Sequence, residues 1–567
     1  MNLRYCLIPL CIFIISCSQT GVQSRTSSPT PKAPSRTESG VRAGAYYDYL
    51  SAQFYLAEKQ IDKAVEAYNS ALKNDPTSPI LLTELATLNI RQGNIDTALR
   101  LAEEARTYDP GYEPAHMLLG QLYAGLGRNS SAIDAYRKVI EINPENEDAF
   151  LLLGALYAQE RRFEEAMDAF DRLRDLLPDN PLALYYKARV FLDMKFYHQS
   201  EQMYQEVLAI EPALETALLD LAYIYEVTDR PKEAEATYLR ILSYNSASVH
   251  ARTRLGNLYM RMDRPDDALV HFGQILKLNR KDLESRLKIG IIHLQQKNYE
   301  DAIKDFTYLL KEEPQYDQAL YYLGTTYEEK QDSEQAIRNF RLVSRNSPLW
   351  GMAQTRLALL FAKMNDYPSG VKVLRDAIEK QPDTPDLYLY LGVIYEEARQ
   401  YDEALRSLDT GLERAPQDTD LLFRKGILLD KMQRKEEAID VMRQVLELEP
   451  QNANALNYIG YTYAEMGIHL SEAKRLIKAA LELAPDDGYI MDSLAWVYYR
   501  QGHYRKALEV IQDAIRLVPN DPVIHEHLGD IYMSLGKKNK AAEAYEKALE
   551  YKHSEPEKIR EKIRQTR

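Results

Sequence analysis

Most of this chain is a succession of short amphipathic segments. Apolar residues recur every three or four positions within each segment, which places their side chains on one face of an α-helix. Two successive segments contain Leu118, Leu119, Leu122 and Tyr123, then Ala132, Ala135, Tyr136 and Val139. Pairs of this kind follow one another from residue 45 to residue 555. Because one pair cannot bury its apolar face alone, the pattern predicts helix pairs that stack on their neighbours.

Proline marks a period of about 34 residues in this array. The prolines in this register are Pro76, Pro110, Pro144, Pro178, Pro212, Pro314, Pro348, Pro382, Pro416, Pro450, Pro485 and Pro519. Proline ends a helix because it lacks an N–H and clashes with the preceding turn. Ser246 and Arg280 occupy two positions of the register without proline, and Ser200 and Gly370 replace a recurrent alanine. The array is therefore either looser or bent near residues 200–280, or it tolerates these changes.

Small and aromatic residues recur in the same register, as at Gly120, Tyr123 and Ala132. Small residues allow two helix backbones to approach closely, and an aromatic ring fills the space beside them. This arrangement resembles the tetratricopeptide repeat (TPR) family over residues 45–555. The resemblance implies an all-α fold, a TPR superhelical solenoid of about 15 helix–turn–helix repeats. Residues 556–567 are expected to form a C-terminal capping helix.

Residues 1–16 have the features of a bacterial lipoprotein signal peptide. Arg4 precedes an apolar run, residues 5–15, that is too short to span a bilayer as a helix. The run ends in Ile-Ile-Ser before Cys17, which resembles the lipobox. The resemblance implies cleavage before Cys17 and lipidation of its thiol. The alternative is an ordinary signal peptide with a chance cysteine.

Cys17 begins a segment, residues 17–44, that is rich in Ser, Thr and Pro. Such a segment buries too little apolar surface to fold, so we predict a disordered tether. Ser18 follows the cysteine, which resembles outer-membrane sorting in Gram-negative lipoproteins rather than inner-membrane retention. We therefore expect a lipid-anchored protein of the cell envelope, on the outer membrane and facing the periplasm.

The residue types that carry chemistry form no catalytic or metal-binding motif. No cysteine follows Cys17, and His525 and His527 would face different ways on a helix. There is neither a phosphate-binding loop nor a nucleophile elbow. We therefore predict no enzymatic activity, no cofactor and no metal ion.

The formal net charge of −14 argues against nucleic acid as the main partner. The acidic surplus lies within residues 45–555, because the N-terminal segments and the C-terminal tail are basic. An acidic surface either attracts partners with a basic face or only keeps the protein soluble.

In the TPR family, the first helix of each unit lines a concave groove that contacts partner proteins. By this resemblance, the partner-binding residues are Asn457, Tyr461, Tyr489, Asp492, Trp496, Tyr499, Arg500, Tyr223 and Tyr321. Tyr, Trp and Arg side chains dominate binding energy at many interfaces. The alternative is that these side chains pack between adjacent units.

The stretch from Ala455 to Gly502, with one residue inserted near Ile468, resembles the C-terminal units of long bacterial TPR lipoproteins. This resemblance implies a membrane-anchored scaffold or adaptor in the envelope that presents client proteins to a processing protease or an assembly machine. The alternative is a structural subunit of a secretion, pilus or polysaccharide-export apparatus. In both cases we expect the partners to be other proteins, and the membrane through the lipid anchor.

Overall fold

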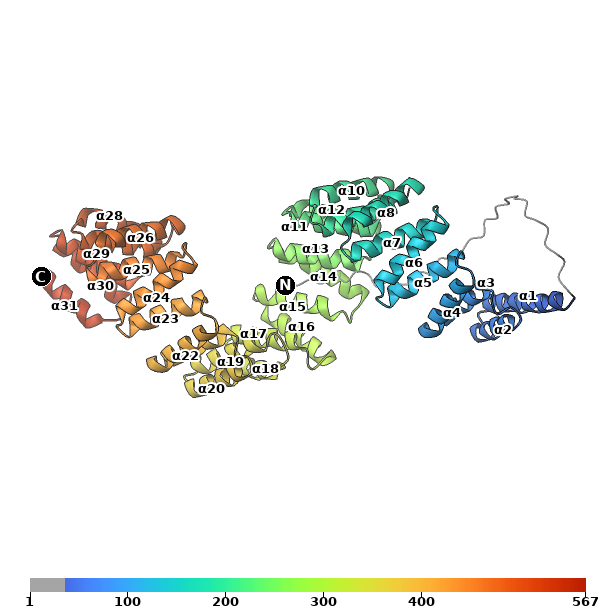
Figure 1. The fold of residues 1–567 in the computed structure, drawn as a ribbon. Coiled ribbons are helices and arrows are strands. Elements are labelled where there is room, and N and C mark those ends of the chain that lie inside the picture. Colours follow the sequence, from blue (N-terminus) through green and yellow to red (C-terminus); the bar gives the residue numbers. More distant parts are fainter. Residues whose placement is uncertain (1–35, 179) are drawn as a thin grey trace. The chain divides into compact units, whose positions relative to one another are not determined.

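The structure is a computed structural model that describes residues 36–178 and 180–567, with side chains from Ala43 onward. Its regular structure consists of 31 α-helices, and these described residues contain no β-strand (Figure 1). Consecutive helices form pairs, and neighbouring pairs pack on one another within each of two compact units, residues 1–280 and 281–567. The predicted all-α repeat fold is confirmed.

The first compact unit contains seven helix pairs. The first helices of these pairs are α1 (Arg36–Ala57), α3 (Pro79–Arg91), α5 (Glu113–Gly125), α7 (Glu147–Gln159), α9 (Pro181–Asp193), α11 (Glu215–Val227) and α13 (Val249–Arg261). The second helices are α2 (Ile61–Asn74), α4 (Ile95–Tyr108), α6 (Asn129–Ile142), α8 (Phe163–Leu176), α10 (Tyr197–Ile210), α12 (Pro231–Tyr244) and α14 (Pro265–Leu278).

The second compact unit contains eight further pairs and a final helix, α31 (Pro556–Thr566). Its first helices are α15 (Leu283–Gln295), α17 (Asp317–Glu329), α19 (Trp350–Lys363), α21 (Pro385–Glu397), α23 (Thr419–Lys431), α25 (Ala453–Met466), α27 (Gly488–Arg500) and α29 (Pro522–Ser534). Its second helices are α16 (Tyr299–Glu312), α18 (Ser333–Leu342), α20 (Tyr367–Lys380), α22 (Tyr401–Arg414), α24 (Lys435–Leu448), α26 (Leu470–Leu483), α28 (Tyr504–Leu517) and α30 (Lys538–Glu550).

Small residues on the first helices make room for aromatic rings from the second helices. A Cβ atom added to Gly154 of α7 would lie 2.6 Å from the Phe170 ring of α8, and Gly256 and Phe272 have the same relation at 2.7 Å. Both rings are almost completely buried. Burial of one such side chain stabilises the fold by roughly 1.5–3 kcal/mol, so these crossings hold each helix pair together.

The turn inside each pair contains a residue with a left-handed backbone, whatever side chain that residue carries, and the turn between α25 and α26 contains two, Gly467 and His469. Gly93 (φ 81°) occupies this position between α3 and α4, and Lys195 (φ 62°) occupies it between α9 and α10. The N–H groups of Lys195 and Phe196 donate to the carbonyls of Leu192 and Phe191, at 2.9 and 2.8 Å. The turn thereby satisfies carbonyl groups that the end of the helix leaves without partners.

The prolines that mark the period are not needed to end the second helices. Helix α14 ends at Leu278 without a following proline, at the same point of the repeat as helix α4, which precedes Pro110. Ser200 of α10 is buried, and its hydroxyl donates to the carbonyl of Ala188 on α9 at 2.7 Å. The helix pairs between residues 197 and 278 therefore keep the boundaries of their neighbours in spite of the substitutions there.

The array begins earlier than expected, whereas its C-terminal helix lies at the expected residues. Helix α1 begins at Arg36 and so extends into the segment that we assigned to the tether; no proline occurs after Pro34 to stop it. At the other end, Ile559 of α31 is fully buried against a cluster that includes Tyr545 of α30. The predicted signal peptide and Cys17 lie outside the described residues.

Candidate functional site

Three consecutive first helices, α25, α27 and α29, bring an aromatic–histidine cluster together within the second compact unit. We define this cluster as Tyr461, Asp492, Trp496, Tyr499 and His527. Tyr461, Trp496 and Tyr499 are half-buried, whereas Asp492 and His527 are buried. Because the repeat aligns equivalent positions of successive units, side chains far apart in the sequence meet along this surface.

The Trp496 indole lies between two other rings. It stacks on the Tyr499 ring at a centroid distance of 4.6 Å and on the His527 imidazole at 4.1 Å. The centroids of Tyr461 and His527 are 6.4 Å apart. Offset stacking of this kind contributes about 0.5–1.5 kcal/mol per pair beyond the burial of area, so the cluster is held in one arrangement before any partner binds.

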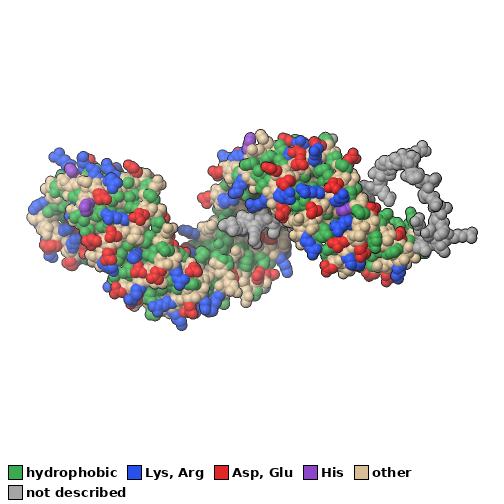
Figure 2. All heavy atoms as spheres, viewed as in Figure 1, with side chains coloured by type: hydrophobic (Ala, Val, Ile, Leu, Met, Phe, Trp, Pro, Cys, Tyr) green, Lys and Arg blue, Asp and Glu red, His purple; other side chains and the backbone are tan. Residues whose placement is uncertain are grey.

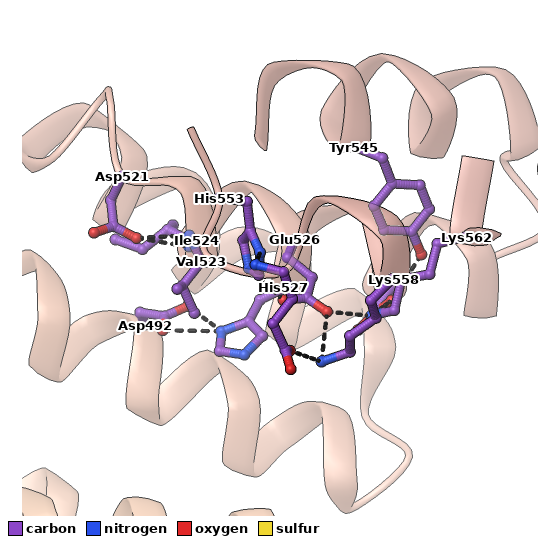
Figure 3. Close-up of polar contacts among 12 residues, drawn as sticks. Asp492, Asp521, Val523, Ile524, Glu526, His527, Tyr545, His553, Lys558 and Lys562 are labelled. Atoms are coloured by element: carbon purple, nitrogen blue, oxygen red, sulfur yellow. Dashed lines mark hydrogen bonds and ion pairs between the residues drawn. The ribbon is translucent and has the colours of Figure 1, made fainter. Parts of the chain in front are cut away.

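His527 and Asp492 form a buried pair (Figure 3). The Nδ1 atom of His527 lies 2.9 Å from both carboxylate oxygens of Asp492. Burial by itself disfavours a charged imidazole, but the adjacent Asp492 carboxylate outweighs it and raises the pKa of His527 above its ordinary value. The pair thus favours a protonated imidazole stacked on Trp496.

Two polar atoms beside the cluster have no hydrogen-bond partner among the described residues. They are Nε1 of Trp496 and Oδ1 of Asn457, and both atoms are buried. Buried polar groups are nearly always hydrogen-bonded in native proteins, so each exception calls for an explanation. Because both atoms are buried, a bound partner would reach them only if the side chains that cover them moved.

The end of the array is closed by ion pairs between α29 and α31 (Figure 3). The ammonium group of Lys562 lies 2.7 Å from Glu526 and 2.6 Å from Asp530, and that of Lys558 lies 3.3 Å from Glu526. Burial alone would raise the pKa of Glu526, but the two lysines lower it to about 2. Glu526 and Asp530 are therefore already neutralised by the chain's own C-terminal helix.

The other predicted partner-binding residues fall into different environments. Tyr489 of α27 is 56% exposed. Arg500 is also exposed, and its Nη1 donates to the carbonyl of Glu465 on α25 at 2.7 Å. Tyr223, on α11 of the first compact unit, is half-buried. Only the residues of α25 and α27 lie together as one surface.

Two predicted residues differ from the expectation of an exposed groove position. Asp492 is buried in its pair with His527, and Tyr321 of α17 is 5% exposed. The Nε of Arg356 on α19 donates to the Tyr321 hydroxyl at 3.1 Å. Both side chains bridge adjacent units because the next first helix covers them, so in this structure they are packing residues.

His527 is the cluster residue that sequence reasoning missed. The neighbouring histidine on its own helix, His525, gives no indication of this contact, because the partner Asp492 lies one unit earlier, 35 residues away. The repeat period was the available signal, because it places side chains of adjacent units next to one another. Among the described residues, no group of three His, Cys, Asp or Glu side chains could hold a metal ion.

Acidic and basic side chains are interspersed on the face of the molecule shown in Figure 2. The acidic surplus of the sequence is therefore not gathered into one patch on that face. None of the described helices combines the length and apolar character that crossing a bilayer requires.

Models of the tetratricopeptide repeat match most of the array. One model matches residues 118–181, 253–306, 287–348, 355–419 and 493–555; a second matches 55–122 and 89–135; a third matches 419–452. TPR proteins mediate interactions between proteins, and no catalytic family is indicated by these matches.

Individual relatives match only parts of the chain. Small glutamine-rich tetratricopeptide repeat-containing protein 2 of Mycosarcoma maydis is 31% identical over 87 residues, which are 15% of this chain and 25% of that protein. A TPR repeat-containing protein of Pseudomonas aeruginosa is 50% identical over 50 residues, 9% of this chain and 8% of that protein. The chain thus matches a quarter or less of the length of these relatives.

Among solved structures, a tetratricopeptide repeat protein from Parabacteroides merdae is 18% identical and covers 44% of this chain and 99% of its own, with a TM-score of 0.37. The repeat register, the stacked helix pairs and the family models agree. This chain belongs to the tetratricopeptide repeat family.

Proposed function

We propose that this protein is a membrane-anchored scaffold of the bacterial envelope that binds client proteins through the surface of α25, α27 and α29. The observation that supports the site is the aromatic–histidine cluster, in which the stacked rings of Trp496 and Tyr499 and the ring of Tyr461 are only half-buried. Aromatic side chains of this kind anchor interfaces because they bury a large area at a small loss of rotamer freedom.

The anchoring part of the proposal rests on the lipobox-like sequence that ends at Cys17. A lipid on this residue would tether the repeat array to the membrane and leave the cluster, several hundred residues later in the chain, free to meet soluble partners. We propose that the clients are then passed to a processing protease or an assembly machine. A structural role in a secretion, pilus or polysaccharide-export apparatus is the second candidate, on the same resemblance.

The test is recovery of envelope proteins by the full-length chain after detergent extraction, followed by mass spectrometry. Trp496→Ala and Tyr489→Ala should each reduce recovery of a specific partner, by roughly 10-fold or more for a central anchor. Tyr244→Ala is the matched control, because Tyr244 is 55% exposed and Tyr489 is 56% exposed. Equal recovery by all three variants would contradict the assignment of the site. Recovery of a protease would support the scaffold role, and recovery of an export channel would support the structural role.

A further inference from the structure

The two ends of the repeat array expose side chains of opposite character, polar at one end and apolar at the other. At the C-terminal end, the exposed positions of α31 are charged or polar apart from Pro556. At the N-terminal end, every exposed residue of α1 from Ala43 to Ala57 is apolar or aromatic and uncharged. These residues are Ala43, Tyr46, Tyr47, Leu50, Phe54 and Ala57. Terminal repeats of solenoid proteins normally need a polar outer face, and none of the described residues provides one at the N-terminal end.

The uncovered face of α1 is the face on which units pack inside the array. Tyr47 is 73% exposed and Phe54 is 61% exposed. Their equivalents one repeat later, Leu81 and Leu88 of α3, are only 5% and 2% exposed. Helix α3 packs against α2, the second helix of the preceding pair. The exposed face of α1 therefore suits a helix that packs there as the second helix of a preceding unit would.

The spacing of the exposed side chains also favours a helix as the occupant. Ala43, Tyr47, Leu50, Phe54 and Ala57 alternate at intervals of four and three residues, which is the seam of a two-helix coiled coil. A helix that lies on a bilayer instead presents a broad apolar arc with basic residues along its polar face. We refer to these five residues as the α1 seam.

The order of side-chain types along the α1 seam is the same in both directions, although the intervals on the two sides of Leu50 differ by one residue. Leu50 is flanked by aromatic Tyr47 and Phe54, and these are flanked by the small residues Ala43 and Ala57. When two copies run antiparallel around Leu50, Ala43 of one copy lies level with Ala57 of the other, and Tyr47 lies one residue from the level of Phe54. No charge is desolvated, and the same surface serves both copies, as a two-fold interface demands.

We propose that two copies of this protein associate through an antiparallel pairing of their α1 helices. The polar surface of α31 prevents a copy from adding head-to-tail at the other end, so the association stops at two. An interface of one helix from each copy is smaller than a standard protein–protein interface, and we expect a dissociation constant on the order of micromolar. This inference does not depend on the proposed client site.

The first test measures the mass of the full-length chain in detergent by light scattering across about 1–100 μM, a range set by the expected affinity. We expect a concentration-dependent dimer. Leu50→Glu places two carboxylates at the two-fold axis and should weaken dimerisation by on the order of 100-fold or more. Val270→Glu is the matched control, because Val270 and Leu50 are both 58% exposed, and it should still form the dimer. Unchanged far-UV helix signals should accompany both variants.

The second test fixes the direction of the pairing by disulfide formation, in a chain whose native cysteines, Cys6, Cys11 and Cys17, are changed to Ser. Leu50→Cys should give a covalent dimer, and Val270→Cys should not. Ala43→Cys alone should stay monomeric on a denaturing gel, whereas a mixture of Ala43→Cys and Ala57→Cys chains should cross-link between copies. Cross-linking of Ala43→Cys with itself would overturn the antiparallel arrangement. A wild-type chain that stays monomeric overturns the proposal. This holds also when the chain is monomeric because residues 1–35 cover the α1 seam, or because the seam binds lipid vesicles.

Discussion

The buried pair of His527 and Asp492 makes the stability of the C-terminal units depend on pH in a defined direction. The pKa of His527 is raised in the folded protein, so the folded state binds a proton more tightly than the unfolded chain does. The resulting stabilisation is fully present below the ordinary histidine pKa of about 6.5 and is lost as the pH rises through the folded-state value. Glu526 and Asp530 on the same helix act in the same direction as Asp492.

The perturbation that isolates this effect is Asp492→Asn. The asparagine oxygen can still accept a hydrogen bond from a neutral imidazole, but it cannot balance the charge of a protonated one. His527 is 5% exposed, so water cannot replace the lost carboxylate. We expect a loss of about 1–3 kcal/mol in the free energy of unfolding at about pH 5.5, the range for a buried group left without its partner, and a smaller loss at about pH 8.5.

The assay is urea unfolding followed by the fluorescence of Trp496, which lies against His527. Trp350 is the other tryptophan of the chain, and Trp350→Phe removes its signal. Asp440→Asn is the control, because Asp440 is 69% exposed and pairs with Arg443 only at the surface. If Asp492→Asn and the parent protein show the same change in stability between the two pH values, the pair does not hold the proton and the reasoning is refuted.

Further predictions concern the anchor, the helix crossings and the C-terminal cap. Cys17→Ala should abolish incorporation of labelled fatty acid and release the protein from the membrane fraction, and retention there would contradict the lipoprotein assignment. Gly256→Ala brings a Cβ atom to 2.7 Å from the Phe272 ring and should destabilise by about 1–3 kcal/mol, whereas Gly273→Ala, with no atom within 4 Å of the added Cβ, should be neutral or stabilising on thermal unfolding. Lys562→Ala leaves the buried Glu526 and the partly buried Asp530 of α29 with fewer partners, and hydrogen exchange should show that α31 opens more readily.

The repeat register made most of the fold predictable from the sequence. Amphipathic spacing located the helix pairs, and the recurrent small residues, such as Gly154, marked the crossings where a ring from the second helix is inserted. Proline was a less direct signal, because it marks the end of a helix that stops there in any case. Helix α14 shows this, since it ends at Leu278 with no proline after it.

The candidate site was predictable only in part, because its contacts join different units. Trp496 and Tyr499 lie three residues apart on α27, so helical spacing alone places them beside each other, and they stack at 4.6 Å. Position in the repeat did not reveal that Asp492 would be buried, because that depends on which side chain the following helix directs toward it. In this chain the side chain is His527, whose imidazole both binds the carboxylate and covers it.

The left-handed turn residues offer a route to a more heat-resistant protein. Most of the turns between paired helices use a residue other than glycine, such as Lys59, Arg161 or Gln433, at φ values near 60°. This conformation costs an L-residue roughly 1–2 kcal/mol, and glycine would avoid that strain at an entropic cost of about 0.4–1 kcal/mol in the unfolded chain. Each replacement by glycine is thus expected to be a small gain. Because the stability of a repeat array sums over its units, several such changes could raise its thermal tolerance without altering the binding surface.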